Sequence, residues 1–384
     1  MFKKTVLYLL LICIIFSGCA FEKTKENEEK VISKADLQSE KIEKLLSKMS
    51  LEEKIYQMMF VTPESITNEK NVTRAILKSE LEMHPVGGII YFSENFVSKE
   101  QTMQMIQNTK TESKIPLFTG VDEEGGKVSR LGSNKNMEFP SVSSMRKIGD
   151  TEDSQKAYEV GIELGINLEK YGFNTNFAPV ADVILNSNNT EIGSRSFGTD
   201  TNLVSKMVEG FVKGMGTTNV LSVLKHFPGH GSTSVNSHNG YSESKRTLDQ
   251  IRNFELLPFK KGIKSGTSFV LVSHMTLPNA VNEKVPCTLS KEIITDLLKK
   301  ELGFEGIVIT DSMSMGAITK EYTQKDAIIK SINAGSDMIL MPLNVKQSVN
   351  DIKEAVENGV VDEERINDSV RRILRIKMDK FNFM

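Results

Sequence analysis

Three of the chain's five histidines fall within residues 225–241, which read KHFPGHGSTSVNSHNGY. Histidine exchanges protons near neutral pH and binds metals, so this segment could serve either chemistry. His226 and His230 are four residues apart, a spacing that chelates a metal when a helix brings both rings to one face. Pro228 and Gly229 lie between them and disfavour a helix. We therefore predict a loop that positions side chains over a pocket, and no metal site.

Charged and imidazole side chains also follow short apolar runs elsewhere in the chain. Five runs end in such side chains, which are Asp122, Asp182, Lys225 with His226, His274 and Asp311. If the runs are parallel strands of one barrel, their carboxyl ends meet at one rim, which is the active-site face of such folds. We therefore predict a site at these strand ends. For Asp311 taken alone, the alternative role is a helix N-cap.

The elements that would hold these side chains alternate between two patterns. Short apolar runs such as GIVIT and FVLVS are typical of strands that are buried on both faces. The eight strand candidates are residues 57–61, 88–92, 117–122, 174–182, 220–226, 269–274, 306–311 and 337–342. Helical patterns cover residues 99–110, 152–171, 202–215, 248–264, 290–302 and 320–334, and continue from 345 to the end. This alternation predicts an α/β fold, a (β/α)8 TIM-type barrel in a single domain.

Residues at the ends of the helical patterns support these boundaries. Ser50 with Glu53 predicts a capping box. Four glycines follow helical runs and predict left-handed caps, at Gly216, Gly266, Gly303 and Gly335. The alternative fold for 384 residues is an open doubly wound sheet in two domains. That fold calls for a GxGxxG turn after its first strand, and the sequence has none.

The N-terminus reads as a targeting segment. Two lysines precede an apolar run over residues 6–16, and a serine and a glycine then lead to Cys19. This pattern predicts a secretion signal, and its end resembles the bacterial lipoprotein processing site, which would place a lipid on Cys19. An uncleaved anchor is the alternative, although the run is shorter than the roughly 20 residues that span a bilayer. We expect a signal peptide over residues 1–18, a flexible hydrated tether over 19–38 and a folded domain over 39–384.

The composition of the chain gives no support for a nucleic-acid partner. A net charge of -2, with 39% hydrophobic and 26% charged residues, describes an ordinary globular protein and gives no reason to expect a nucleic-acid partner. If Cys19 carries a lipid and Cys13 leaves with the signal, Cys287 has no partner for a disulfide within the chain.

Several motifs together indicate a family. The segment KHFPGHG resembles the signature of the β-N-acetylglucosaminidases of glycoside hydrolase family 3. Further motifs follow in the family's order, namely GVDEEGGKVSRL, NFAPVADV, IGSRSFG, SHMTLP and VITDSMSM. The resemblance covers the chain from about residue 44 to its end, and it implies the barrel fold predicted above.

The resemblance also implies roles for individual residues. Asp311 occupies the nucleophile position, where a carboxylate forms a covalent glycosyl-aspartate intermediate. The positions that hold the terminal sugar are Asp122, Arg130, Arg195, Lys225 and His226. Such charged groups suit sugar hydroxyls because they form strong and bidentate hydrogen bonds. His274 and Asp182 receive no definite step from the resemblance.

The segment that contains the proton-transfer residue departs from the family pattern. His238 matches the histidine that this branch uses as general acid and base, on the loop after the fifth strand. The usual pattern is Asp-Ser-His, whereas this chain has Asn236 before Ser237 and His238. An asparagine can orient the imidazole through its amide oxygen but cannot stabilise the imidazolium by charge. The sequence therefore predicts a slow or modified enzyme.

The resulting expectation is a retaining exo-β-N-acetylglucosaminidase that acts on muropeptides or other peptidoglycan fragments. It would need no cofactor, act as a monomer, and sit at the outer face of the cytoplasmic membrane through its lipid anchor. Two alternatives remain. One is a sugar-binding lipoprotein with lost or weak turnover, which Asn236 favours. The other is a phosphorylase, because a histidine acid does not repel an incoming phosphate as a carboxylate does.

Overall fold

The computed structural model describes residues 34–233, 242–381 and 383. Residues 38–384 form one compact unit. Within the described ranges, no helix combines the length and the hydropathy that a membrane crossing requires.

Eight parallel strands form the centre of this unit. They are β1 (Met59–Val61), β2 (Gly88–Tyr91), β3 (Phe118–Val121), β6 (Thr175–Asn176), β7 (Leu221–Phe227), β8 (Phe269–Val272), β9 (Ile307–Thr310) and β10 (Ile339–Leu340). The sheet order is β10-β1-β2-β3-β6-β7-β8-β9, and a parallel bridge between Ile309 and Met338 joins its two ends. The predicted (β/α)8 barrel is confirmed.

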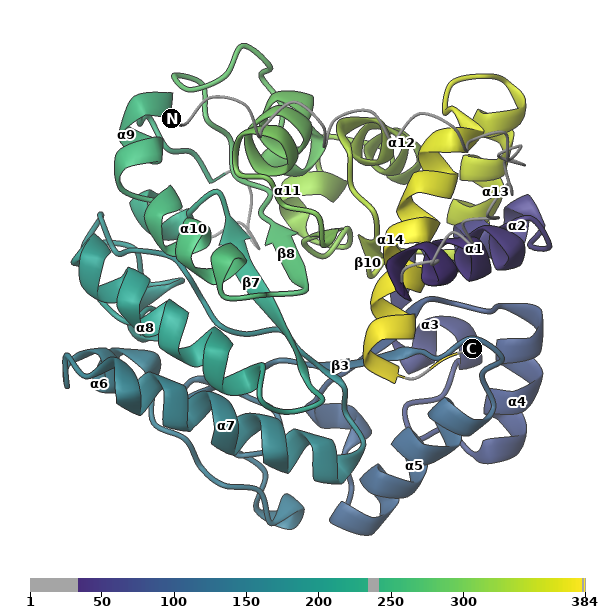
Figure 1. The fold of residues 1–384 in the computed structure, drawn as a ribbon, viewed down its shortest axis with the longest axis horizontal. Coiled ribbons are helices and arrows are strands. Elements are labelled where there is room, and N and C mark those ends of the chain that lie inside the picture. The colour runs from purple at the N-terminus through teal and green to yellow at the C-terminus, as the bar shows by residue number, and fades with distance from the viewer. Residues whose placement is uncertain (1–33, 234–241, 382, 384) are drawn as a thin grey trace, which may run out of the picture. The chain divides into compact units, whose positions relative to one another are not determined.

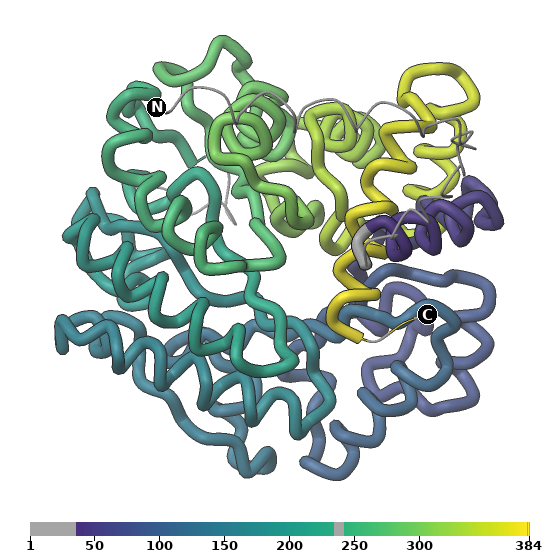
Figure 2. The backbone as a smooth tube through the Cα atoms, in the orientation of Figure 1, coloured from purple at the N-terminus to yellow at the C-terminus, as the bar shows by residue number. Residues whose placement is uncertain are grey.

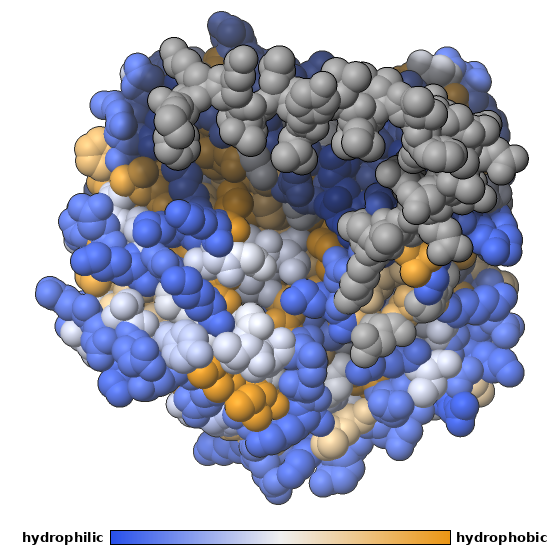
Figure 3. All heavy atoms as spheres, in the orientation of Figure 1, coloured by the Kyte–Doolittle hydropathy of each residue, from blue (hydrophilic) through white to orange (hydrophobic). Residues whose placement is uncertain are grey.

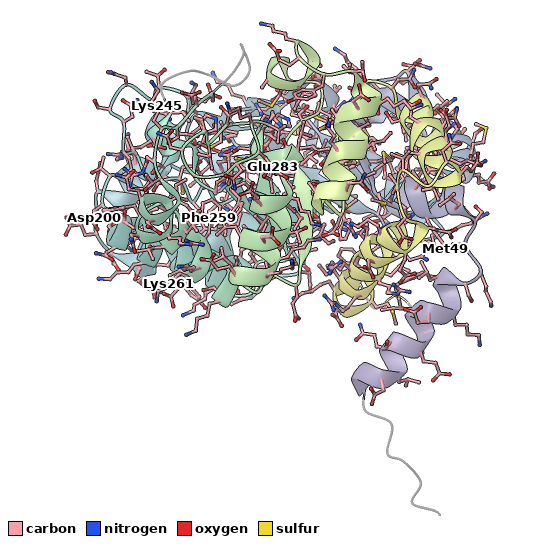
Figure 4. The ribbon with its side chains drawn as sticks, turned by 90° about the horizontal axis from the view of Figure 1, so that it is seen from above. Met49, Asp200, Lys245, Phe259, Lys261 and Glu283 are labelled. Carbon is pink, nitrogen blue, oxygen red and sulfur yellow. The ribbon has the colours of Figure 1, made fainter. Side chains whose placement is uncertain are left out.

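Helices surround the strands and follow one another around the barrel in chain order (Figure 1). They are α1 (Lys34–Leu46), α2 (Leu51–Gln57), α3 (Pro63–Thr67), α4 (Arg74–Met83), α5 (Lys99–Thr111), α6 (Met145–Gly149), α7 (Ser154–Tyr171), α8 (Thr201–Met215), α9 (Leu248–Asn253), α10 (Leu256–Lys264), the π-helix η6 (Glu292–Glu301), α11 (Gly316–Thr319), α12 (Gln324–Ala334), α13 (Val345–Glu357) and α14 (Glu363–Phe381). Figure 4 views the barrel from another side, with Met49 and Asp200 on opposite sides of it.

Most of the predicted helix boundaries hold. Ser50 and Glu53 form the expected capping box before α2. Gly266, Gly303 and Gly335 have positive φ angles, as a left-handed cap requires. The prediction for Gly216 is wrong, because its φ is -63° and its N–H still bonds back into α8. The chain continues in right-handed turns beyond it, so no left-handed residue is needed there.

The helix predicted over residues 248–264 is interrupted. It forms as two helices, α9 and α10, with Phe254 and Glu255 between them. Pro258 explains the break, because a continuous helix would need an N–H at 258 to bond the carbonyl of 254 and would bring the proline ring against that carbonyl. The prediction overlooked this proline.

The fourth strand is much shorter than predicted. Only Thr175–Asn176, out of the expected residues 174–182, pairs as a strand. Pro179 has no N–H to offer the ladder, and Val180 then pairs with Lys225 through an isolated bridge. The chain beyond this point leads Asp182 toward the rim of the barrel.

Aromatic rings fill the barrel interior. Phe60 from β1 packs against Phe118 from β3 with ring centroids 6.4 Å apart, and it meets Phe177 edge-on at 5.3 Å. Phe118 also meets Phe269 from β8 at 5.0 Å. A Cβ at Gly120 would lie 2.8 Å from the Phe177 ring, so this position in β3 has room only for glycine. The barrel is therefore a packed core, and its rim is left for binding.

The C-terminal helix packs against the other end of this core. Lys377 of α14 is buried, donates to Gln57 Oε1 at 2.8 Å, and lies 4.9 Å from the centre of the Phe118 ring. Figure 2 shows α14 beside α1, the first described helix. Arg371 of α14 pairs there with Glu43 of α1 at 2.6 Å.

The outer face seen in Figure 3 is mainly hydrophilic, with separate small hydrophobic areas. The large hydrophobic side chains that are exposed come from well-separated positions in the sequence, for example Met83, Ile166, Phe254, Leu343 and Val360. Scattered apolar residues of this kind are usual on globular proteins.

Candidate active site

A cavity of about 450 Å³ opens at the rim where the strands have their carboxyl ends. Its wall includes Asp122, which follows β3, Lys225 and His226 at the end of β7, and Asp311, which follows β9. Phe92, Ile192 and Met315 add apolar surface to the same wall. Residues far apart in the sequence thus share one cavity.

A short hairpin carries the acidic wall of the cavity. After Asp122 the chain forms β4 (Glu123–Gly125) and turns back as antiparallel β5 (Val128–Ser129). Gly126 makes the turn with a φ of 60°, and a Cβ there would lie 2.7 Å from the Cα of Ser144. Only glycine fits this turn.

Lys225 joins the two carboxylates that face the cavity. Its Nζ lies 2.7 Å from Asp122 Oδ1 and 2.7 Å from Glu124 Oε1. Side chains alternate in direction along an extended chain, so residues 122 and 124 face the same way. The Lys225 side chain is 4% exposed, and two carboxylates satisfy a charge that would otherwise be costly to bury.

Glu124 is bound on its other side by Arg195, which ends the short helical turn η3 (Gly193–Arg195). Arg195 Nε and Nη2 donate to the two Glu124 oxygens, each at 2.9 Å. Burial by itself would raise the pKa of the Glu124 carboxyl, but Arg195 and Lys225 hold that pKa well below its usual range. Glu124 is therefore charged and fixes two cations at the cavity wall.

His226 extends this network to Asp182. Its Nδ1 lies 2.7 Å from Asp182 Oδ2, and its Nε2 lies 3.2 Å from Arg195 Nη2. Arg195 can only donate, so Nε2 accepts and Nδ1 donates its proton to Asp182. Burial would raise the pKa of Asp182, but His226 and His230 lower it overall. Both nitrogens of the His226 ring are thus occupied by protein groups.

Arg130 has one donor that no described residue accepts. Its Nη2 is 3.5 Å from Asp122 Oδ2, and its guanidinium lies 5.4 Å from the centre of the Phe92 ring. Its Nε is buried and has no hydrogen-bond partner within the described part of the chain. A bound hydroxyl would give this atom an acceptor.

Glu123 points away from the cavity and holds the backbone that carries Arg130. Its Oε2 accepts the backbone N–H groups of Arg130 and Leu131, both at 2.8 Å, and Ser129 Oγ also donates to this carboxylate. Burial raises the pKa of Glu123, although these donors act against that shift. This side chain therefore positions Arg130 without touching the cavity.

Asp311 lies at the tip of β9, half-buried in the cavity wall. Its Oδ1 accepts the N–H of Ser312 at 2.8 Å. His274 lies behind this turn, with Nε2 2.9 Å from the Ser312 carbonyl oxygen and Nδ1 2.6 Å from Thr288 Oγ1. The carbonyl can only accept, so His274 donates to it and fixes the backbone next to Asp311.

The structure thus brings together most of the residues that the sequence singled out. These are Asp122, Arg130, Arg195, Lys225, His226 and Asp311, which all line the cavity. His238 and Asn236, the predicted acid–base histidine and its neighbour, lie outside the described residues, as does Cys19. No group of three or more His, Cys, Asp or Glu side chains in the described ranges is arranged to hold a metal ion.

Sequence reasoning missed three residues of this region. Glu124 and Glu123 were quoted within a motif but received no role, although the alternation along β4 could have assigned one to the cavity and the other to the hairpin. His230 was considered only as half of a metal pair. It lines the cavity and leaves one ring nitrogen without a partner among the residues the structure describes.

Comparison with known proteins identifies the family of the chain. The family model described as the glycosyl hydrolase family 3 N terminal domain matches residues 50–376. The Beta-hexosaminidase A of Pseudoalteromonas piscicida is 33% identical over 326 residues, which are 78% of this chain and 54% of that protein. The chain thus spans about half the length of this relative.

Solved structures agree in fold and in sequence. A glycoside hydrolase family 3 β-N-acetylglucosaminidase from Paenibacillus sp. has a TM-score of 0.79 and 32% identity, over 87% of this chain and 63% of that one. A glycosyl hydrolase of the same family from Mycobacterium smegmatis has a TM-score of 0.76 and 30% identity, over 86% of this chain and 98% of that one.

Proposed function

Since this chain belongs to glycosyl hydrolase family 3, we propose that it is a retaining, exo-acting β-N-acetylglucosaminidase. Its substrates are peptidoglycan fragments or muropeptides with a terminal β-linked N-acetylglucosamine. The observation that carries the proposal is the shared cavity, in which Asp311 lines the same wall as Asp122 and Lys225. Two of the relatives are named a β-hexosaminidase and a β-N-acetylglucosaminidase, which supports N-acetylglucosamine as the sugar.

Recognition of the terminal sugar falls to the charged network. Asp122 offers carboxylate oxygens, and Arg130 offers the Nε donor that has no partner within the described chain. Lys225 and Arg195 add further donors, and the His226 ring, whose two nitrogens bond protein groups, borders the cavity beside them. Because Glu124 and Asp182 already hold these cations and the His226 ring in place, the sugar binds a wall whose side chains lose little freedom on binding.

Asp311 attacks the anomeric carbon in the first step. A bond forms between its carboxylate oxygen and C1 while the bond from C1 to the leaving oxygen breaks, and His238 gives that oxygen a proton. In the second step a water attacks C1, His238 takes a proton from this water, and the bond to Asp311 breaks. Two inversions at C1 leave the released sugar in its original β configuration.

The weak point of this reaction is proton transfer. Asn236 takes the place of the aspartate that orients the acid–base histidine in similar enzymes. An amide oxygen accepts a hydrogen bond from the imidazole but adds no charge to stabilise its protonated form. The enzyme is therefore slower than one with Asp-Ser-His, and its extreme form is a sugar-binding protein without turnover.

The proposal includes a location outside the cytoplasm. The signal peptide predicted over residues 1–18 would end before Cys19, and a lipid on this cysteine with the hydrated tether that follows would hold the domain at the membrane surface. Peptidoglycan fragments are within reach of an enzyme anchored there.

Trapping of the covalent intermediate tests the central step. The protein is incubated with an activated 2-fluoro sugar, which slows the second step, and is then digested and analysed by mass spectrometry. We expect one glycosyl adduct on Asp311, and no adduct in Asp311→Asn. Turnover of a β-N-acetylglucosaminide without this adduct would overturn the assigned nucleophile, and sugar binding without turnover would favour the binding protein. A sugar 1-phosphate formed on addition of phosphate would instead indicate a phosphorylase.

A further inference from the structure

His230 lines the cavity but has no role in the reaction proposed above. It starts the short turn η4 (His230–Ser232), two residues beyond Pro228, and is 2% exposed. Its Nε2 is buried and has no hydrogen-bond partner in the part of the chain that the structure describes. A buried polar atom without a partner destabilises the protein, so the atom calls for a ligand or another explanation.

The opposite side of the His230 ring is firmly held. Nδ1 lies 3.0 Å from Thr233 Oγ1, and Asn189 Nδ2 is 3.3 Å from the same hydroxyl. Thr233 Oγ1 is also 2.9 Å from the His230 carbonyl oxygen. These bonds fix the plane of the ring and leave Nε2 as its one hydrogen-bonding position still to be filled.

The backbone of His230 is fixed as well. Its N–H donates to Asp182 Oδ1 at 2.6 Å, while the other oxygen of this carboxylate binds the His226 ring. The next residue, Gly231, packs so closely that a Cβ there would lie 1.9 Å from the Val183 carbonyl oxygen. One buried carboxylate thus holds both imidazoles, with ring centroids 6.1 Å apart.

The environment favours a neutral imidazole. Burial lowers the pKa of His230, and His226 adds to this effect, whereas Asp182, Asp311 and Glu191 act in the opposite direction without reversing it. A neutral ring nitrogen either donates or accepts one hydrogen bond, depending on the tautomer that Thr233 selects. A hydroxyl group is the ligand that suits either case, because it can both donate and accept.

We propose that His230 is a further sugar-binding residue, whose Nε2 hydrogen-bonds one hydroxyl group of the sugar in the cavity. The inference rests on the proposed function, which supplies the sugar. In this proposal His230 binds the sugar directly and takes no part in proton transfer.

Two substitutions separate the two ring nitrogens. His230→Asn retains a polar atom near the position of Nδ1, next to Thr233, and ends short of the cavity. His230→Gln retains a polar atom near the position of Nε2. Affinities for N-acetylglucosamine and for its monodeoxy analogues, each lacking one hydroxyl, are measured by calorimetry. Far-UV circular dichroism and Tm confirm that each variant is folded.

We expect His230→Asn to weaken binding of N-acetylglucosamine about tenfold or more, and His230→Gln to restore most of the loss. One monodeoxy analogue should bind wild type more weakly than the parent sugar does, and His230→Asn should no longer distinguish the two. His84→Asn serves as control, because His84 bonds Tyr56 away from the cavity and its replacement should leave every affinity unchanged.

The outcomes distinguish this inference from the proposed function. For each protein, the affinity of every monodeoxy analogue is divided by the affinity of the parent sugar. If wild type binds the sugar and these ratios are the same in His230→Asn as in wild type, His230 contacts no hydroxyl and the inference is wrong. If wild type binds none of the sugars, the proposed function fails and the inference fails with it.

Discussion

Arg195 and Glu124 form a bidentate pair in which two guanidinium nitrogens donate to the two carboxylate oxygens at 2.9 Å each. Glu124 is buried and Arg195 is largely buried, and Lys225 approaches the same carboxylate to 2.7 Å. Arg195 and Lys225, which we assign to sugar binding, thus both depend on the Glu124 carboxylate.

Glu124→Gln tests this dependence. The amide keeps one acceptor oxygen but turns an N–H₂ group toward a cation, and the loss of one partner from a buried pair costs about 3–5 kcal/mol. We expect kcat/KM on a chromogenic β-N-acetylglucosaminide to fall by about 100-fold, together with a lower Tm. Glu209→Gln is the matched control, since Glu209 pairs with Lys213 and Lys261 on the surface and contributes about 0.2–1 kcal/mol. Equal kinetic losses in both variants would contradict the dependence.

Asn236→Asp tests whether the missing carboxylate limits turnover. A charged aspartate would stabilise the imidazolium of His238, so kcat should rise. Loss of the corresponding carboxylate in serine proteases costs about 10⁴-fold, which sets an upper guide for the gain. The measurement is kcat at neutral pH, with Asn236→Ala as the comparison. Unchanged or lower activity in Asn236→Asp would show that this position does not limit the reaction.

Lys377, on the helix α14 that packs against the barrel core, should make the stability of the folded protein depend on pH. Burial lowers the pKa of its amine well below the usual value, so the unfolded chain holds a proton that the folded chain has released over the pH range between the two pKa values. Stability therefore rises with pH through this range. Lys377→Met should raise Tm at pH 7, and its advantage over wild type should shrink as the pH approaches about 10, the usual lysine value.

The control for this experiment is Lys380→Met, on the same helix but exposed. It removes the same charge without changing the burial of an amine, so its Tm should follow that of wild type at each pH. A Tm difference between Lys377→Met and wild type that stays constant with pH would contradict the assigned cause.

Cys19→Ser tests the lipid anchor. The substitution removes the sulfur that would carry the lipid, so the protein should move from the membrane fraction to the soluble extracytoplasmic fraction. Fractionation followed by immunoblotting measures the shift, with Cys287→Ser as control because Cys287 is buried within the domain. Continued membrane association of Cys19→Ser would favour an uncleaved N-terminal anchor.

Strand–helix alternation was sufficient to predict the barrel, because buried parallel strands leave a strong apolar signal in the sequence. The bounds of individual strands and helices were predicted wrongly where other features of the chain override that signal. The run that leads to Asp182 is apolar from Phe177 to Ala181, yet the chain pairs as a strand only at Thr175–Asn176, before Pro179 removes a donor. Pro258 could have divided the predicted helix over residues 248–264 in advance, since the missing N–H and the ring clash both act within one helical turn.

The sequence predicted most of the residues that line the cavity, but not the residues that hold them in place. Residues at strand ends were recognisable by type and position, as Asp122 and Asp311 show. Glu124 differs, because its importance lies in contacts with Arg195 and Lys225, which are 71 and 101 residues away along the chain. Alternation along β4 places the Glu123 and Glu124 side chains on opposite sides, but only the folded chain brings Arg195 and Lys225 to Glu124.

The neighbours β1 and β10 come from opposite ends of the domain, with Met59 aligned to Ile339. The ribosome delivers the first of them long before the second, so the ring of strands stays open during most of synthesis. Until the final partner arrives, β1 presents unpaired N–H and C=O groups along one side, a surface to which other nascent chains can add. Closure is then a slow, long-range event, because the two strands that meet at this seam lie 280 residues apart along the chain, from Met59 to Ile339.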